Sequence, residues 1–137
     1  MFEERDADAA KQGEFWIARD HLPTGAAGTF YRKLDETLRK IGFAEAVREV
    51  CRPAYRDAGA GGRPGIDPAV YFKMLMIGFF ENLPSERAIA SRCEDSLSLR
   101  AFLGYDLTES TPDHSSLSVI RTRLGSEVYQ AALEIVL

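Results

Sequence analysis

The sequence predicts an all-α protein of about seven short helices in a compact bundle with a helix-turn-helix-like part. Apolar residues recur at the three- and four-residue spacing of helices, and no stretch alternates between apolar and polar residues as a half-buried strand would. Glycines, prolines and capping residues interrupt the apolar stretches at intervals typical of short helices. The 137 residues have the length of one ordinary domain.

Two helices are expected before a glycine-rich run. We expect the first over residues 29–41, with Thr29 as its N-cap and Gly42 as the left-handed residue after its end. The second begins near Phe43 and carries a stripe of apolar residues on one face. The run at 58–65 is interpreted as a flexible connector, because no strand precedes it and no Gly-Lys-Ser/Thr follows it as in a phosphate-binding loop.

The third helix is expected at the centre of the bundle. Asp67 and Pro68 predict its start, since aspartate is a favoured N-cap and proline fits the first helical position. The stretch that follows, as far as Phe80, is apolar on nearly every side. A helix of this kind is buried all round rather than on one face.

Further helices are expected in the second half of the chain. Three residues predict their N-terminal caps: Ser85, Ser96 and Thr111, the last followed by Pro112. Gly104 ends the helix that Ser96 begins. The last helix runs from Ser126 to the end of the chain, with no Gly, Asn or Pro to stop it. We therefore expect a truncated chain, the front part of a longer protein.

We divide the chain into an N-terminal extension, 1–28, that is partly disordered, and a helical domain, 29–137. The net charge of −4 and the apolar fraction of 45% are typical of soluble globular proteins, and no apolar run has the length of a membrane span. The N-terminus lacks the hydrophobic stretch of a signal peptide. Cys51 and Cys93 have no CxxC partners, which favours buried thiols in the cytoplasm.

Few residues indicate catalysis, whereas two groups of small polar and basic residues suit DNA contact. His21 and His114 lack metal-ligand spacing to each other or to the cysteines. Serines and arginines near the N-terminal ends of exposed helices can contact phosphates and base edges. The first candidate group is Ser85, Arg87, Arg92, Ser98 and Arg100. The second candidate group is His114, Ser115, Ser118, Arg121 and Arg123.

The charge of both groups is low for a DNA-binding surface. Arginines and acids cancel over residues 85–103, and residues 111–125 carry a net charge of +1. Strong nonspecific binders are usually more basic. A structural interpretation therefore stays open, in which Ser85, Asp113 and Ser115 cap helices and the arginines pair with neighbouring acids.

A series of motifs resembles the N-terminal domain of InsH-type bacterial insertion-sequence transposases. In order, the motifs are QGEFW (12–16), GRPGIDP (62–68), Ser-Glu-Arg (85–87), SLSLRAFLGY (96–105), TPDHSSLS (111–118) and RTRL (121–124). The resemblance implies that a ribonuclease-H-like core follows this domain. In that core three acidic residues bind two divalent metal ions, usually magnesium, and the core cuts and joins DNA at terminal inverted repeats.

The resemblance assigns recognition rather than catalysis to this chain. The sequence ends before the first catalytic acid of the family, so we expect no catalytic residue, no bound metal and no other cofactor here. The expected partners are terminal inverted repeats, bound weakly by this chain alone, and no membrane. The alternative is a protein-interaction module or truncated remnant that pairs with a full-length transposase and regulates it. Its contact surface would lie on the last helix, at Val128, Leu133, Val136 and Leu137. A third hypothesis is an independent enzyme.

Overall fold

The computed structural model describes residues 2–5, 25–56 and 65–137. In these segments the secondary structure is α-helical, apart from one isolated bridge between Phe2 and Gly65, so the predicted all-α class is confirmed. The helices are α1 (Ala26–Lys40), α2 (Phe43–Arg56), α3 (Pro68–Phe80), α4 (Glu86–Glu94), α5 (Leu97–Leu103), α6 (His114–Arg123) and α7 (Ser126–Val136).

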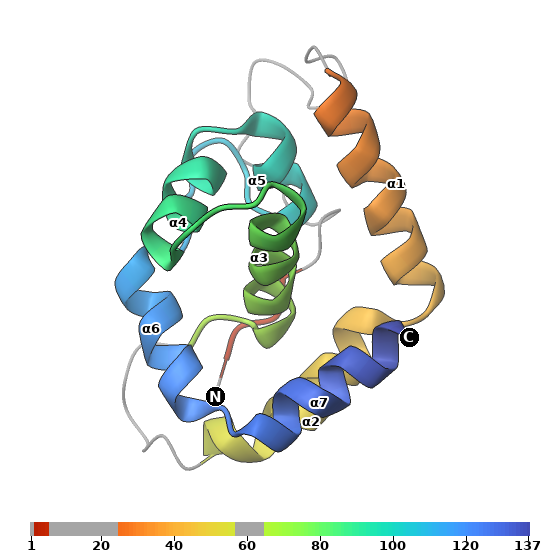
Figure 1. The fold of residues 1–137 in the computed structure, drawn as a ribbon, viewed down its shortest axis with the longest axis vertical. Helices are drawn as coiled ribbons and strands as arrows, with labels where there is room; N and C mark the ends of the chain where they lie inside the picture. Colours follow the sequence, from red (N-terminus) through yellow and green to blue (C-terminus); the bar gives the residue numbers. More distant parts are fainter. Residues whose placement is uncertain (1, 6–24, 57–64) are drawn as a thin grey trace.

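Helix α3 lies at the centre of the bundle, as predicted (Figure 1). Its side chains are buried on several faces, with Tyr71, Met74 and Ile77 each at most 1% exposed. Helices α4 and α5 lie on one side of α3, and α2 and α7 pack against each other across one end (Figure 1). Helix α6 packs against α4, which brings the two sequence motifs around Ser85 and His114 into one region.

Local chemistry sets most helix boundaries where the sequence predicts them. The carboxylate of Asp67 accepts a hydrogen bond from the backbone N–H of Ala69 at 2.9 Å, and Pro68 is the first helical residue. The hydroxyls of Ser85 and Ser96 cap α4 and α5 in the same way. Gly42 and Gly104, after α1 and α5, adopt positive φ angles of 67° and 85°, which favour glycine.

Two predicted caps are wrong. Helix α1 begins at Ala26 with Gly25 as N-cap, so Thr29 lies inside the first turn, where its hydroxyl donates to the Gly25 carbonyl. Alanine has the highest helix propensity, and this extends the helix by most of a turn. Helix α6 is capped by Asp113 instead of Thr111, and its carboxylate accepts from the Ser116 N–H at 2.8 Å.

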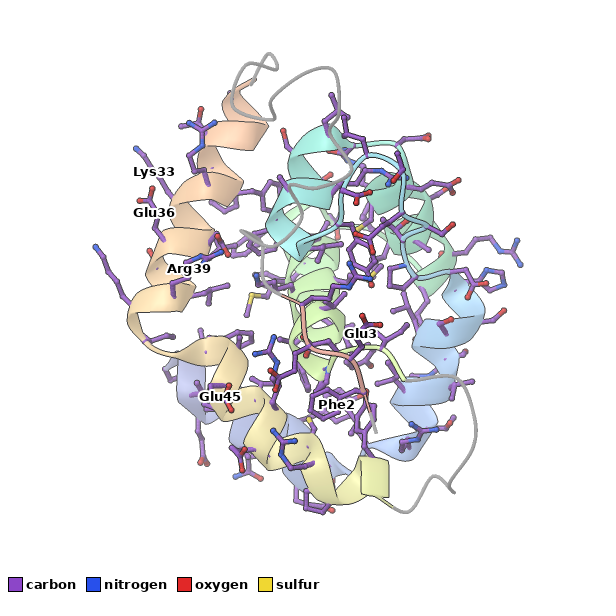
Figure 2. All side chains as sticks on the ribbon, turned by 180° about the vertical axis from the view of Figure 1, so that it is seen from behind. Phe2, Glu3, Lys33, Glu36, Arg39 and Glu45 are labelled. Atoms are coloured by element: carbon purple, nitrogen blue, oxygen red, sulfur yellow. The ribbon has the colours of Figure 1, made fainter. Side chains whose placement is uncertain are left out.

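Two residues of the predicted extension, Phe2 and Arg5, pack against the helical domain. The ring of Phe2 is buried and packs edge-on against Tyr55, with centroids 5.0 Å apart (Figure 2). The backbone N–H of Arg5 donates to Asp67 at 2.5 Å. Residues 26–28, also assigned to the extension, form the start of α1. The remainder of the extension at 6–24, which includes the QGEFW motif, and residues 58–64 of the connector predicted at 58–65 lie outside the described residues.

Cys51 and Cys93 are buried free thiols, as predicted. Burial raises the pKa of Cys51 to about 11 and that of Cys93 to about 12. Among the helices that the structure describes, none combines the length and apolar character needed to cross a membrane.

Candidate nucleic-acid interface

The two candidate groups meet where the N-terminal turn of α4 lies against α6. Arg87 is the second residue of α4 and His114 is the first residue of α6. The Nη2 atom of Arg87 lies 3.3 Å from Nε2 of His114. Residues that are 27 positions apart in the chain therefore share one surface, with Arg87 exposed and His114 half-buried.

A second contact between the same helices centres on Glu86. One carboxylate oxygen of Glu86 lies 3.3 Å from the hydroxyl of Ser118 and 3.3 Å from Nη1 of Arg121. The Nη2 atom of Arg121 also donates to the Ser118 hydroxyl at 3.2 Å. A carboxylate, a hydroxyl and a guanidinium thus form a closed triangle across α4 and α6.

The remaining serines of this surface differ in role. Ser85 is the N-cap of α4, and its hydroxyl accepts from the Ala88 N–H at 3.1 Å, which is the structural role foreseen as an alternative. Ser115 is exposed on α6, one turn before Ser118. We call the surface formed by Ser85, Arg87, His114, Ser115, Ser118 and Arg121 the α4/α6 face.

Two tyrosine hydroxyls join α3 to α7. The hydroxyls of Tyr71 in α3 and Tyr129 in α7 lie 2.6 Å apart. Burial and this hydrogen bond raise the pKa of Tyr71, while the negative charge of Glu86 adds to the shift and Arg121 opposes it. The Glu86–Arg121 pair therefore lies near the junction of α3 and α7.

Arg92 and Arg100 are not part of the α4/α6 face. Arg92 forms an ion pair with Glu81 at 2.7 Å, and the same carboxylate accepts from the Tyr31 hydroxyl at 2.6 Å. Arg100 donates to three backbone carbonyls, those of Glu94, Asp106 and Glu109. Arg92 fixes the last turn of α4 to the end of α3, and Arg100 fixes the end of α4 and the loop after α5 to α5, so both arginines have structural partners.

Arg123 and Ser98 also lie apart from the face. The guanidinium of Arg123 lies over the ring of Tyr55, 5.2 Å from its centroid, where it joins the end of α6 to α2. Ser98 is half-buried on α5. The sequence groups therefore divide into residues that converge between α4 and α6 and residues that hold the bundle together.

Sequence reasoning did not single out Glu86. It lies between two candidates in the Ser-Glu-Arg motif, but it entered only as a charge that cancels an arginine. Its partners lie 32 and 35 residues further along the chain, and a single sequence carries no signal for that pairing.

Within the described part of the chain, no three His, Cys, Asp or Glu side chains are grouped so that they could hold a metal ion. The transposase resemblance places its magnesium ions in the catalytic core, so it implies no metal site among these residues. No step of the function proposed for this domain runs through a metal.

Comparison with known proteins gives one match. A family model described as Transposase domain (DUF772) matches residues 17–123. The matched range ends at the last residue of α6, so it contains both helices of the α4/α6 face, and α7 lies beyond it. No curated protein and no solved structure matches the chain.

Proposed function

This chain belongs to the DUF772 transposase domain family, and from that membership we propose that it serves in transposition as a DNA-recognition and assembly domain. The InsH-like order of the sequence motifs supports a place at the N-terminal side of an insertion-sequence transposase, before the catalytic core. In this proposal the core cuts and joins DNA, whereas the present chain contributes binding and assembly and is not itself an enzyme.

The contact between Arg87 and His114 is the observation that carries the DNA-binding part of the proposal. It places the N-terminal turns of two helices next to each other on an exposed surface. Helix N-termini present backbone N–H groups and a partial positive charge, both of which favour phosphate. Arginine adds a planar set of donors that suits phosphate and guanine.

We assign separate roles to the residues of the α4/α6 face. Arg87 and Arg121 contact phosphates and set the position of the domain on the duplex, because such contacts carry no sequence information. We assign contacts with base edges to His114 and Ser115, which lie at the start of α6. Two arginines supply few phosphate contacts, so the chain alone binds weakly and gains affinity when several copies or a core hold the same DNA.

The test compares the wild-type chain on a duplex carrying the terminal inverted repeat of the parent element with a scrambled duplex of equal composition. We expect tighter binding to the inverted repeat, and weaker binding to both duplexes after the double substitution of Arg87 and Arg121 by alanine. Loss of two phosphate contacts should flatten the salt dependence, the slope of log affinity against log salt, by about 1.8.

The matched control removes the same charge elsewhere. Lys33 and Lys40 are exposed on α1, and Lys33 points outward on the side of the molecule away from α6 (Figure 2). Their double substitution by alanine should change binding much less than the arginine pair. Equal weakening by both double variants, or equal affinity for both duplexes, would contradict specific recognition by the α4/α6 face.

A second candidate function, self-association, is favoured by the surface of α7. Leu133, Val136 and Leu137 are 58%, 44% and 93% exposed. Val128, predicted for the same surface, instead packs against the core. Substitution of Leu133 and Val136 by serine should lower the sedimentation-derived mass at high protein concentration if α7 joins two chains. A wild-type monomer at every concentration would rule this out.

The proposed site of action is the cytoplasm. Buried thiols without disulfide partners support this assignment, because disulfides are rare in that compartment.

A further inference from the structure

We propose that Glu86 is a built-in competitor of DNA, a carboxylate that occupies the phosphate-binding groups of α6 until a DNA phosphate replaces it. This inference rests on the proposed DNA-binding role of the α4/α6 face. Its starting point is that Glu86 places one anionic oxygen 3.3 Å from both the Ser118 hydroxyl and Nη1 of Arg121. A hydroxyl and a guanidinium around one oxygen are also the donors that proteins use to bind phosphate.

The contacts of Glu86 are of a kind that another anion can replace. Both distances of 3.3 Å are longer than the 2.7–2.9 Å of strong charge-assisted hydrogen bonds. The side chain of Arg121 is 58% exposed and that of Glu86 is 21% exposed, so solvent and ligands can reach the guanidinium. Exposed ion pairs of this geometry contribute little to stability, and separating them costs little.

Two ion pairs that join α3 to its neighbours differ in this respect. Asp67, which holds Arg48, has a fully buried side chain at 2.7 Å, and Glu81 holds Arg92 at 2.7 Å. Those pairs are short and join core elements. Among these three pairs, only the Glu86–Arg121 pair is both long and highly exposed on the arginine side.

The competition couples every DNA contact of Arg121 to the loss of its contact with Glu86. When Arg121 turns to a phosphate it must leave Glu86, so every DNA contact of Arg121 carries the loss of an intramolecular ion pair. This loss applies to any sequence, because phosphates are the same in every duplex. The expected result is a modest loss of affinity that is the same for every DNA sequence.

The test measures binding of the full chain to the inverted-repeat duplex and the scrambled duplex over a salt titration. The main variant is Glu86→Gln, which keeps the size and the acceptor oxygen of the side chain. We expect it to bind both duplexes about two- to fivefold more tightly than wild type at each salt concentration, because Arg121 then gives up no ion pair when it contacts a phosphate. The gain should vanish in the Arg121→Ala background, because the competitor then has no guanidinium to occupy.

The matched control is Glu94→Gln, which removes the same charge from the last residue of α4, about 12 Å along the helix axis from Glu86. If Glu86→Gln and Glu94→Gln increased the DNA affinity equally, the effect would come from net charge alone, and this would overturn the inference. So would unchanged binding by Glu86→Gln when Arg121→Ala still weakens binding, a result that leaves the DNA-binding role intact. If the alanine variants of Arg87 and Arg121 bind like wild type, the DNA-binding role fails and the inference fails with it.

Discussion

Arg48 and Asp67 form a buried ion pair, with Nη2 of the arginine 2.7 Å from a carboxylate oxygen, that joins α2 to the first turn of α3. The same carboxylate caps α3 through the Ala69 N–H and accepts from the backbone N–H of Arg5. One side chain thus ties the N-terminal segment, α2 and the central helix together. The α4/α6 face depends on this arrangement because α4 packs directly on α3.

Asp67→Ala should lower the free energy of unfolding by about 3–5 kcal/mol, because it leaves the buried guanidinium of Arg48 without its partner. Urea denaturation measures this change. Glu45→Ala is the control, since Glu45 is an exposed residue 3.7 Å from Arg48 and should change stability by less than about 1 kcal/mol. Equal effects of the two substitutions would show that Asp67 does not have the structural role described.

Gly42→Ala should destabilise the protein by about 1–2 kcal/mol through backbone conformation alone. Gly42 has a φ of +67°, and a Cβ atom there would meet nothing within 4 Å. Gly25→Ser is the control, because the space around Gly25 is equally open, its φ of −81° suits any residue, and serine is a favoured N-cap. Thermal unfolding measures the midpoint temperature of each variant. Similar midpoints for the two variants would contradict the left-handed turn between α1 and α2.

The stability of the protein should fall as the pH rises above about 9. In the folded state burial holds the pKa of Cys51 at about 11 and that of Cys93 at about 12, above the ordinary value of 9.0. Below pH 9 both thiols are neutral in the folded and unfolded states, and the full stability is present. Above it the unfolded state loses protons first, so each thiol steepens the fall by up to about 1.4 kcal/mol per pH unit.

Urea denaturation at pH 8 and at pH 10 measures this fall. Cys93→Ala should lose stability at both pH values and show a smaller difference between them. An unchanged pH difference in Cys93→Ala would contradict the assignment of the effect to that thiol.

Arg100→Ala should destabilise the fold by about 1–3 kcal/mol and leave the salt dependence of DNA binding unchanged. Its guanidinium donates to backbone carbonyls on both sides of α5, at 2.9 Å for Glu94 at the end of α4 and at 2.7 Å for Glu109 in the loop after α5. Removal leaves these acceptors without their donor. Urea denaturation measures the stability, and a DNA titration of the same preparation over a range of salt concentrations measures the salt slope. If Arg100→Ala instead flattened the salt slope and left the stability unchanged, Arg100 would belong among the DNA-binding residues.

Local sequence signals predicted most of the fold. Asp67, Ser85 and Ser96 cap helices because a short polar side chain before an apolar stretch can accept from the N–H groups of the first turn. Thr29 and Thr111 carry the same signal, but at each position another residue starts the helix. Which of two neighbouring residues caps a helix depends on how the whole helix packs, and the local sequence pattern carries no information about that packing.

The candidate site was only partly predictable. Sequence placed Arg87 and His114 in two separate groups, and the packing of α4 on α6 brings them together. It could not distinguish them from Arg123, whose partner Tyr55 lies 68 positions earlier in the chain. Residue type and helix position identify side chains able to contact DNA, whereas their long-range partners decide which of them are available.

The most direct test of the central claim is to map DNA contacts by NMR, from the chemical shifts of backbone amides during titration with the inverted-repeat duplex. We expect the largest changes at the start of α4 and along α6, around Arg87, His114 and Ser115, with little change on the outer side of α1. Changes confined to α1 or α7, or no change at saturating DNA, would contradict the assignment of DNA recognition to the α4/α6 face.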